Sequence, residues 1–271
     1  MENPMPVAIS KKIAVVTGAS SGIGAVYADR LAARGYDLIL VARRADRLEA
    51  LSKKILKTYA GANVEVIAAD LAKESDLVRV EKILATNPAV RILVNNAGLA
   101  RLAAIALAPV QQSLAQIALN ITSVTRLTHA VLPALLSRND GVIVNIASVL
   151  AIHSLPVSSV YSGTKAFVLN FSRGLQDELV GTGVKVQVVL PASTATEIWD
   201  ASGLPLSALD QDTVMSAETL VDAALAGLDK GEAITWPTVA DASLWDKYDA
   251  ARSTLFAATQ TNKPAARYKA I

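Results

Sequence analysis

Tyr161 and Lys165 are the side chains of this sequence whose types and spacing best suit proton chemistry. They lie in a segment with apolar residues at helical spacing, so residues four apart are expected on one face of a helix. A phenol has a pKa of about 10 and is a poor proton donor or acceptor at neutral pH. An ammonium about 4 Å away, worth roughly 4 kcal/mol at an effective dielectric constant of about 20, would lower that pKa. The pair predicts a tyrosine that exchanges a proton with a carbonyl or alcohol oxygen.

A glycine-rich segment near the start of the chain strengthens this interpretation, because the tyrosine–lysine spacing alone arises by chance in many helices. A β-branched run at 13–16 leads into Thr17-Gly18-Ala19-Ser20-Ser21-Gly22-Ile23-Gly24, and an amphipathic segment follows at 25–34. Glycines let the backbone turn tightly and approach a pyrophosphate, whose charge the start of the next helix favours. The context predicts a phosphate-binding strand, turn and helix, with a ligand-free turn as the alternative.

Two more motifs follow in order along the chain, Asn95-Asn96-Ala97-Gly98 and then Ser148 ahead of Tyr161. Together with the glycines at 18, 22 and 24 and the Tyr161/Lys165 pair, they resemble the short-chain dehydrogenase/reductase family in its compact single-domain branch. The resemblance covers about residues 12–196. It implies a Rossmann-like fold with a seven-stranded parallel sheet in the order 3-2-1-4-5-6-7, and a nicotinamide cofactor.

The resemblance also implies a role for each residue of a catalytic set. Tyr161 exchanges the proton, Lys165 lowers its pKa and binds the nicotinamide ribose, and Ser148 orients the substrate oxygen. Asn120 matches the family's fourth member, which orders a water beside the lysine. An asparagine inside an apolar helix is costly unless it is hydrogen-bonded, so a functional or helix-kinking role is expected. His153 is interpreted as a pocket-wall or surface residue rather than the base.

The end of the second predicted strand indicates which coenzyme is used. Enzymes that prefer NAD usually carry an acidic residue there, to bind the ribose hydroxyls. Here Ala42 takes that place and Arg43 and Arg44 follow. Arginine suits a 2′-phosphate in charge and geometry, which predicts NADP(H), with Arg43 the stronger candidate. The alternative is that both arginines are ordinary solvated charges.

The resemblance implies further coenzyme contacts along the carboxyl edge of the sheet. They are Gly18, Ser20, Ser21, Gly22, Ile23, Gly24, Asp70, Leu71, Asn96, Ala97, Gly98, Pro191 and Thr196, besides Arg43, Arg44, Tyr161 and Lys165. Asp70 could equally cap the next helix, and an asparagine at a strand end is also a turn former. Ala192 stands where the family has glycine, so either this turn differs or a strained backbone is tolerated.

Short apolar runs alternate with longer helical patterns, which favours a doubly wound α/β fold with a parallel sheet. The expected strands are 13–17, 37–41, 64–68, 91–95, 141–146, 184–190 and 233–236. The expected helices are 25–34, 45–58, 75–86, 114–137, 161–179 and 217–229. No linker or repeat interrupts the pattern, which predicts one domain over 1–271. Residues 197–215 lack periodicity and are expected to form a substrate lid, while 243–271 is expected to be partly helical.

Composition excludes several other classes of protein. The chain has 271 residues, of which 52% are hydrophobic and 18% charged, and a net charge of +2 with both signs interspersed. Nothing in it predicts nucleic acid as a partner. It has no cysteine and two histidines, which are too few for most metal sites. No apolar run approaches a membrane span and the start lacks the pattern of a secretory signal, so a cytoplasmic protein is expected.

The sequence therefore predicts an NADPH-dependent enzyme that reversibly reduces a ketone or aldehyde, with a small carbonyl or alcohol compound as substrate. The alternatives are an enzyme whose role is to oxidise a hydroxysteroid or similar alcohol, and a regulatory protein without activity. An intact Ser148/Tyr161/Lys165/Asn120 set argues against the latter. The helices at 114–137 and 161–179 carry apolar residues on more than one face. This excess of apolar surface, together with the family resemblance, predicts a homo-oligomer. A tetramer is favoured over a dimer.

Overall fold

The computed structural model describes residues 12–268 and divides into two compact units. Unit 1 ends at Pro237 and unit 2 begins at Thr238. Every predicted site residue lies in unit 1. That the entire chain forms a single domain stays a prediction.

Unit 1 is built on a seven-stranded parallel sheet with the order β3-β2-β1-β4-β5-β6-β9, which confirms the predicted Rossmann-like topology. The strands are β1 (Ile13–Thr17), β2 (Asp37–Ala42), β3 (Val64–Ala68), β4 (Val90–Asn95), β5 (Gly141–Ile146), β6 (Val184–Val189) and β9 (Ile234–Thr235). Because all seven run in one direction, their carboxyl ends meet at one edge of the sheet. Open α/β sheets bind their ligands at that edge.

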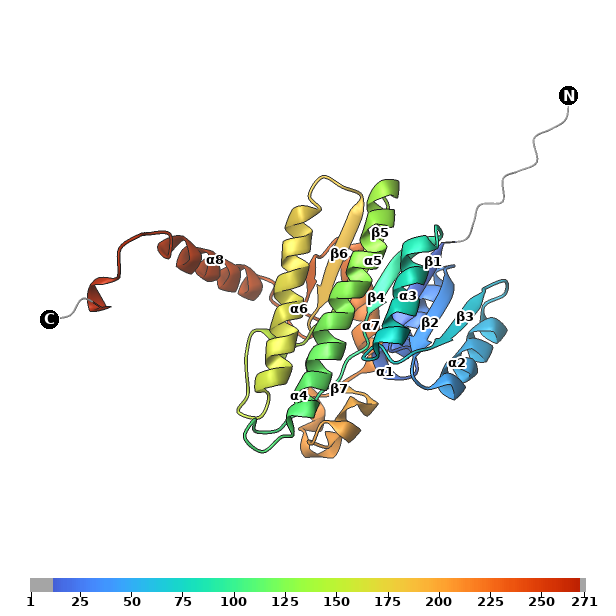
Figure 1. Ribbon diagram of the computed structural model, residues 1–271, viewed down its shortest axis with the longest axis horizontal. Coiled ribbons are helices and arrows are strands. Elements are labelled where there is room, and N and C mark those ends of the chain that lie inside the picture. The colour runs from blue at the N-terminus through green and yellow to red at the C-terminus, as the bar shows by residue number, and fades with distance from the viewer. Residues whose placement is uncertain (1–11, 269–271) are drawn as a thin grey trace, which may run out of the picture. The chain divides into compact units, whose positions relative to one another are not determined.

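Helices bury both faces of this sheet (Figure 1). On one face lie α1 (Gly22–Ala33), α2 (Ala45–Thr58) and α7 (Ala217–Asp229), and on the other α3 (Glu74–Thr86), α5 (Ser123–Arg138) and α6 (Ser159–Glu178). Successive strand residues point to opposite faces, so Ala14 and Val16 join the first apolar cluster and Val15 the second. Burial on both faces explains why the strands are continuous apolar runs rather than alternating ones.

The helix predicted at 114–137 is divided in the structure. It consists of α4 (Val110–Ile117), a π-helical turn η1 (Ala118–Thr122), and α5. Asn120 lies in η1, where its carboxamide bonds to the backbone of Leu99. Turns of this kind are rare and often mark functional sites. Apolar spacing within the helix could not predict it, because the turn is held by a contact with a distant segment.

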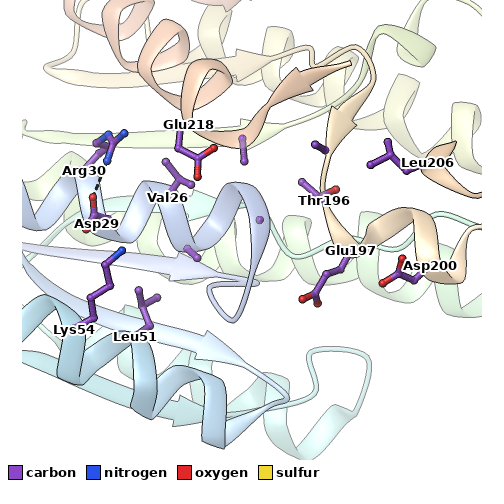
Figure 2. A pocket seen from close by; sticks show the side chains of 14 residues that line it. Val26, Asp29, Arg30, Leu51, Lys54, Thr196, Glu197, Asp200, Leu206 and Glu218 are labelled. Carbon is purple, nitrogen blue, oxygen red and sulfur yellow. Dashed lines mark hydrogen bonds and ion pairs between the residues drawn. The ribbon is translucent and has the colours of Figure 1, made fainter. Parts of the chain in front are cut away.

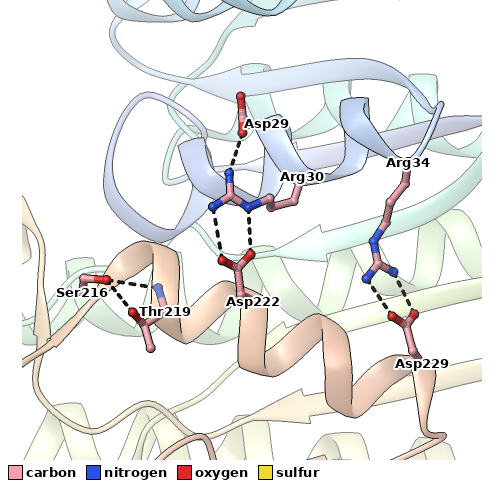
Figure 3. Close-up of polar contacts among 7 residues, drawn as sticks. All are labelled: Asp29, Arg30, Arg34, Ser216, Thr219, Asp222 and Asp229. Carbon is pink, nitrogen blue, oxygen red and sulfur yellow. Dashed lines mark hydrogen bonds and ion pairs between the residues drawn. The ribbon is translucent and has the colours of Figure 1, made fainter.

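Ion pairs join α1 to α7 on one face of the sheet (Figure 3). Arg30 donates to Asp222 at 2.7 Å, and Arg34 donates to both carboxylate oxygens of Asp229 at 2.8 and 2.7 Å. Pairs this exposed are each worth only about 0–1 kcal/mol. The buried apolar face of α7 therefore provides most of the attachment between the two helices.

Residues 197–215, the predicted lid, contain three short 3₁₀ turns, η3 (Glu197–Ala201), η4 (Leu206–Ala208) and η5 (Gln211–Thr213). The strand pair β7 (Thr194–Ala195) and β8 (Met215–Ser216) brings the two ends of this segment side by side. The Leu102 N–H donates to the Ser202 carbonyl oxygen at 2.6 Å, so the segment also contacts the chain that follows β4. The role of a lid stays a prediction.

Unit 2 contains α8 (Ser243–Ala258) and the 3₁₀ turn η6 (Ala266–Tyr268), in agreement with the expected partly helical C-terminal segment. No residue of α8 is buried, and Leu244, Leu255 and Phe256 are well exposed. Across residues 12–268, none of the helices combines the length and apolar character needed to cross a membrane.

Candidate active site

The turn between β1 and α1 follows a backbone path that requires glycine. Gly18 and Gly22 have φ values of +67° and +53°, in the left-handed region. A Cβ atom on Gly18 would lie 2.9 Å from the Cα atom of Ala97, and one on Gly24 would lie 2.4 Å from the Gly18 carbonyl oxygen. The turn is thus packed against the end of β4, with the first residues of α1 at the carboxyl edge of the sheet.

Asn96 and Thr17 hold this turn to β4. The Asn96 carboxamide donates to the carbonyl oxygens of Thr17 at 2.9 Å and Gly18 at 3.3 Å. The Thr17 hydroxyl accepts from the N–H groups of Asn96 and Ala97, both at 3.0 Å, and donates to the Val94 carbonyl oxygen at 3.1 Å. Asn96 therefore has the structural role of an asparagine that forms a turn at the end of a strand. Its predicted place beside the adenosine ribose stays a prediction, and Thr17 was missed because a threonine ending a strand carries no distinctive pattern.

Arg44 is the arginine that contacts the glycine turn. Its guanidinium group donates to the hydroxyl of Ser20 at 3.0 Å and to that of Ser21 at 2.7 Å. Ser21 occupies the N-cap position of α1 but makes no capping side-chain bond, so the first N–H groups of α1 keep no side-chain partner there. Arg43 is exposed and has no polar partner within residues 12–268. Of the two predicted arginines, Arg44 is thus the one at the turn.

Glu197, at the start of η3, also contacts this arginine. One carboxylate oxygen accepts from Arg44 at 2.6 Å and the other accepts from Arg47. Hydrogen bonds from Arg44 and Arg47 lower the pKa of Glu197 to about 2, so the group is ionised at neutral pH. Sequence analysis missed both Glu197 and Arg47. The two segments lie 153 residues apart, and only the fold brings them together.

Asp70 and Leu71 form the turn after β3. The Asp70 carboxylate accepts from the Ala72 N–H at 3.1 Å, and the Asp70 N–H donates to Asp76 at 2.8 Å, while the Leu71 side chain is buried. These bonds are those of a turn-forming aspartate. Contact of Asp70 with the adenine stays a prediction.

The segment after β6 departs from the family pattern without backbone strain. Within residues 12–268 the only non-glycine residue with a positive φ is Asn139, so Ala192 adopts no left-handed conformation. The Pro191 carbonyl oxygen accepts from the Val149 N–H at 2.9 Å, which joins this segment to the one after β5. Thr196 lies against the glycine turn, because a Cβ atom on Gly22 would be 2.9 Å from its methyl carbon.

The four predicted catalytic residues meet where β5, α6 and η1 come together. Tyr161 and Lys165 lie in the first turns of α6, and Ser148 follows β5. Lys165 is only 6% exposed, and its ammonium group donates to the Ile146 carbonyl oxygen at 2.8 Å. That ammonium nitrogen lies 5.7 Å from the centroid of the Tyr161 ring. Ser148 is buried, its hydroxyl accepts from the Leu150 N–H at 3.1 Å, and it lies near enough to Tyr161 to affect the pKa of the phenol.

The net shift of the Tyr161 pKa in the structure is upward, and the lowering of this pKa by Lys165 stays a prediction. Burial raises the pKa of Tyr161 to about 12, although its hydrogen bond with Ser148 opposes the shift. Burial also lowers the pKa of Lys165 to about 8. Both groups have lost water, which disfavours their charged forms, and the ammonium is directed to Ile146 rather than to the phenol oxygen. The phenol therefore carries its proton at neutral pH, although the raised pKa makes it a weaker acid than a free phenol.

Asn120 is 1% exposed and links three parts of the site. Its carbonyl oxygen accepts from the Leu99 N–H at 2.8 Å, and its amide donates to the Leu99 carbonyl oxygen at 2.9 Å and to the Thr164 hydroxyl at 3.0 Å. A Cβ atom on Gly98 would lie 3.5 Å from the Asn120 carbonyl oxygen and 3.6 Å from the Lys165 nitrogen. Asn120 and Lys165 thus border the same stretch of backbone. His153, by contrast, is exposed.

Replacing Asn120 with alanine is expected to lower both stability and kcat. The substitution leaves the part-buried Leu99 N–H and carbonyl groups without their side-chain partner, at about 1–3 kcal/mol for each unsatisfied group, whereas the Thr164 hydroxyl still donates to the Tyr161 carbonyl oxygen. We expect a loss of about 2–5 kcal/mol in the free energy of unfolding, measured with urea. As a comparison, Asn120→Asp keeps the acceptor for the Leu99 N–H, loses the two donated bonds and places a carboxyl oxygen beside the Leu99 carbonyl oxygen. A wild-type kcat for the folded alanine variant would remove Asn120 from the proton path.

A pocket of about 640 Å³ lies beside the glycine turn, between α1, α2, α7 and the start of η3 (Figure 2). Gly22 and Thr196 line one end, and Asp29, Lys54 and Glu218 line the rest. None of the four predicted catalytic residues borders it. The pocket therefore adjoins the predicted coenzyme site on the side away from Tyr161 and is not the place of proton transfer.

The residues at the carboxyl edge suit a nicotinamide dinucleotide by their chemistry. The glycine turn leaves no room for side chains and the N-cap of α1 is not closed by one, which suits a pyrophosphate. Arg44 with Ser20 and Ser21 forms a donor set for an anionic group on the adenosine ribose. Buried Lys165 lies at the other end, beside the proton donor.

Comparison with known proteins gives a consistent result. The model of the short chain dehydrogenase family matches residues 12–204. A short-chain dehydrogenase from Sphingobium yanoikuyae, solved in complex with NADPH, is 43% identical, with a TM-score of 0.92 over 95% of this chain and 100% of that one. The bulky-bulky ketone specific alcohol dehydrogenase from Comamonas testosteroni is 38% identical, with a TM-score of 0.88 over 96% of this chain and 100% of that one.

Among curated proteins, the human 17-beta-hydroxysteroid dehydrogenase type 3 is 38% identical over 185 residues. That match covers 68% of this chain and 59% of the relative, so the chain spans about three fifths of the length of that protein. These matches confirm the predicted family. They also confirm the predicted nicotinamide cofactor at the level of the family, whose members use NAD(P)H.

Proposed function

We propose that this chain, which belongs to the short-chain dehydrogenase family over residues 12–204, is an NADPH-dependent oxidoreductase that reversibly reduces a ketone or an aldehyde to an alcohol. The observation that carries the proposal is the convergence of Ser148, Tyr161, Lys165 and Asn120 at the carboxyl edge of the sheet. No metal is needed for this chemistry.

The residues of the chain supply orientation and a proton. Ser148 holds the substrate oxygen beside the phenol, and Tyr161, protonated at neutral pH, gives its proton to that oxygen as negative charge develops. Lys165 is a buried cation near the phenol ring, and it favours the phenolate that forms. When bound, the reduced coenzyme supplies the hydride. Asn120 borders Lys165 along Gly98, and it completes a path by which Tyr161 regains its proton.

The preference for NADPH rests on the end of β2. Ala42, at 8% exposure, offers no carboxylate to bind ribose hydroxyls or to repel a 2′-phosphate. Arg44 stands at the glycine turn with two serine hydroxyls, and Arg43 is exposed beside it. The Sphingobium relative with bound NADPH supports the same choice.

The apolar residues around the catalytic set favour an apolar substrate with bulky groups. Ile152, Leu155 and Val157, in the segment between Ser148 and Tyr161, are 41%, 43% and 40% exposed. The predicted lid adds Leu204. The ketone specificity in the name of the Comamonas relative supports testing ketones with two bulky substituents first.

A panel of ketones, aldehydes and secondary alcohols, followed by the absorbance of the reduced nicotinamide, tests this proposal. We expect reduction of at least one bulky ketone, with kcat/KM at least about tenfold higher for NADPH than for NADH. Equal values with the two coenzymes would contradict the coenzyme preference. No turnover with any member of the panel would favour the regulatory alternative.

The second candidate is oxidation of a hydroxysteroid or a similar secondary alcohol, because the same residues operate in both directions. The similarity to the human 17-beta-hydroxysteroid dehydrogenase type 3 favours including steroids in the panel. A larger kcat/KM for steroid alcohol with NADP than for any ketone with NADPH would support this candidate. For the cellular location we propose the cytoplasm.

We expect the protein to be a homo-oligomer, with a tetramer favoured over a dimer. In the structure, Val124, Leu127, Val131 and Leu135 of α5 are buried within unit 1, so only part of the apolar surplus of this helix is available. The apolar side chains that stay accessible include Leu136, which is 39% exposed, and the stacked, partly buried rings of Phe167 and Phe171 on α6. Light scattering at micromolar concentration should give about four times the 28.4 kDa chain mass. A monomer mass would refute the prediction.

A further inference from the structure

The guanidinium group of Arg44 is shared between the glycine turn and a carboxylate from the lid segment. It donates to Ser20 and Ser21 on one side and to Glu197 at 2.6 Å on the other. The proposed function assigns the same guanidinium group to the 2′-phosphate of NADPH. A carboxylate and a phosphate are both anions that prefer two parallel bonds with arginine, so they compete for its donors and repel each other.

We infer that Glu197 is a coenzyme-specificity residue that competes with the 2′-phosphate of NADPH for Arg44 and thereby weakens NADPH binding selectively. This inference rests on the proposed function, because NADH carries no 2′-phosphate and does not need Arg44. Glu197 places one oxygen on Arg44 and the other on Arg47. It can therefore give up Arg44 to the phosphate and keep Arg47, which makes the exchange possible without unpairing the carboxylate.

Protonation does not relieve this competition under ordinary conditions. Hydrogen bonds from Arg44 and Arg47 lower the pKa of Glu197 to about 2, so the carboxylate is charged at neutral pH. Exposure limits the strength of the contact, because the side chains of Arg44, Arg47 and Glu197 are 39%, 43% and 41% exposed. Water and salt screen pairs of this kind, and a moderate effect on affinity is expected.

The test measures dissociation constants by calorimetry for NADPH, NADH and 2′,5′-ADP, a fragment that carries the 2′-phosphate without the nicotinamide. In Glu197→Gln, NADPH and 2′,5′-ADP should bind about three- to tenfold more tightly, and NADH should change less than about twofold. The matched control is Asp200→Asn. Asp200 is an exposed carboxylate in the same turn η3 that has no ion pair with Arg44 or Arg47. Asp200→Asn should leave the ratio of the NADPH and NADH dissociation constants unchanged.

A double-mutant cycle identifies the partner. If Glu197 acts through Arg44, Glu197→Gln should have no selective effect on NADPH binding in an Arg44→Ala background. An equal effect on NADPH and NADH, or the same effect from Asp200→Asn, would overturn the inference. So would weaker NADPH binding in Glu197→Gln, which would make Glu197 a support for the arginine. The proposed coenzyme preference fails separately, if the unmodified protein binds NADH as tightly as NADPH.

Discussion

Replacing Tyr161 with phenylalanine is expected to lower kcat by about 10²–10⁴-fold, the usual contribution of a general acid. The substitution removes only the hydroxyl, and the ring that contacts Lys165 remains. Because Tyr161 is protonated at neutral pH and lies near Ser148 and Lys165, we assign it the donation of a proton to the substrate oxygen. Steady-state rates with the best ketone of the panel measure the loss.

Coenzyme binding provides the control for this variant. The dissociation constant of NADPH should stay within about threefold of the wild-type value, since the phenol oxygen is not among the groups assigned to the phosphates or the adenosine. Ser148→Ala is the companion variant, because it removes the hydrogen bond that opposes the raised pKa of the phenol. If the phenylalanine variant kept activity within about tenfold of the wild type, the assignment of Tyr161 as the proton donor would be lost.

Replacing Arg44 with alanine is expected to weaken NADPH binding by about 1.5–3 kcal/mol, roughly 10- to 150-fold, as is typical for hydrogen bonds to a charged group. Arg44 donates to Ser20 and Ser21 of the glycine turn. Its removal leaves the two serine hydroxyls there without the charged donor beside them. Binding of NADH should change by less than about threefold, because it brings no 2′-phosphate to this position. Fluorescence or calorimetric titration with both coenzymes measures the difference.

Arg43→Ala is the matched control, since Arg43 is the neighbouring arginine and is exposed. Sequence reasoning favours Arg43, and the contacts in the structure favour Arg44. If Arg43→Ala weakened NADPH binding more selectively than Arg44→Ala does, Arg43 would again be the better candidate for the 2′-phosphate contact. If Arg44→Ala weakened the binding of NADPH and of NADH equally, Arg44 would have a structural role in the glycine turn instead.

Much of the fold follows from local patterns in the chain. The alternation of apolar runs with helical segments predicts the strands, and their burial on both faces agrees with the two apolar clusters of the structure. The seventh strand, expected at 233–236, is β9. The glycines at 18, 22 and 24 and the pair on α6 are likewise local signals, because their chemistry depends on residues a few positions apart. The family could therefore be predicted without coordinates, and the strand order followed from the resemblance to that family.

Tertiary structure alone decided three features of the site. The π-helical turn at Asn120 is held by the backbone of Leu99, and the partner of Arg44 is Glu197 from a distant segment. The upward shift of the Tyr161 pKa depends on the loss of water around the phenol, and spacing gives the distance to a charge but not the depth of burial. Each feature depends on which segments pack together and how deeply they are buried. Periodicity and spacing do not carry that information.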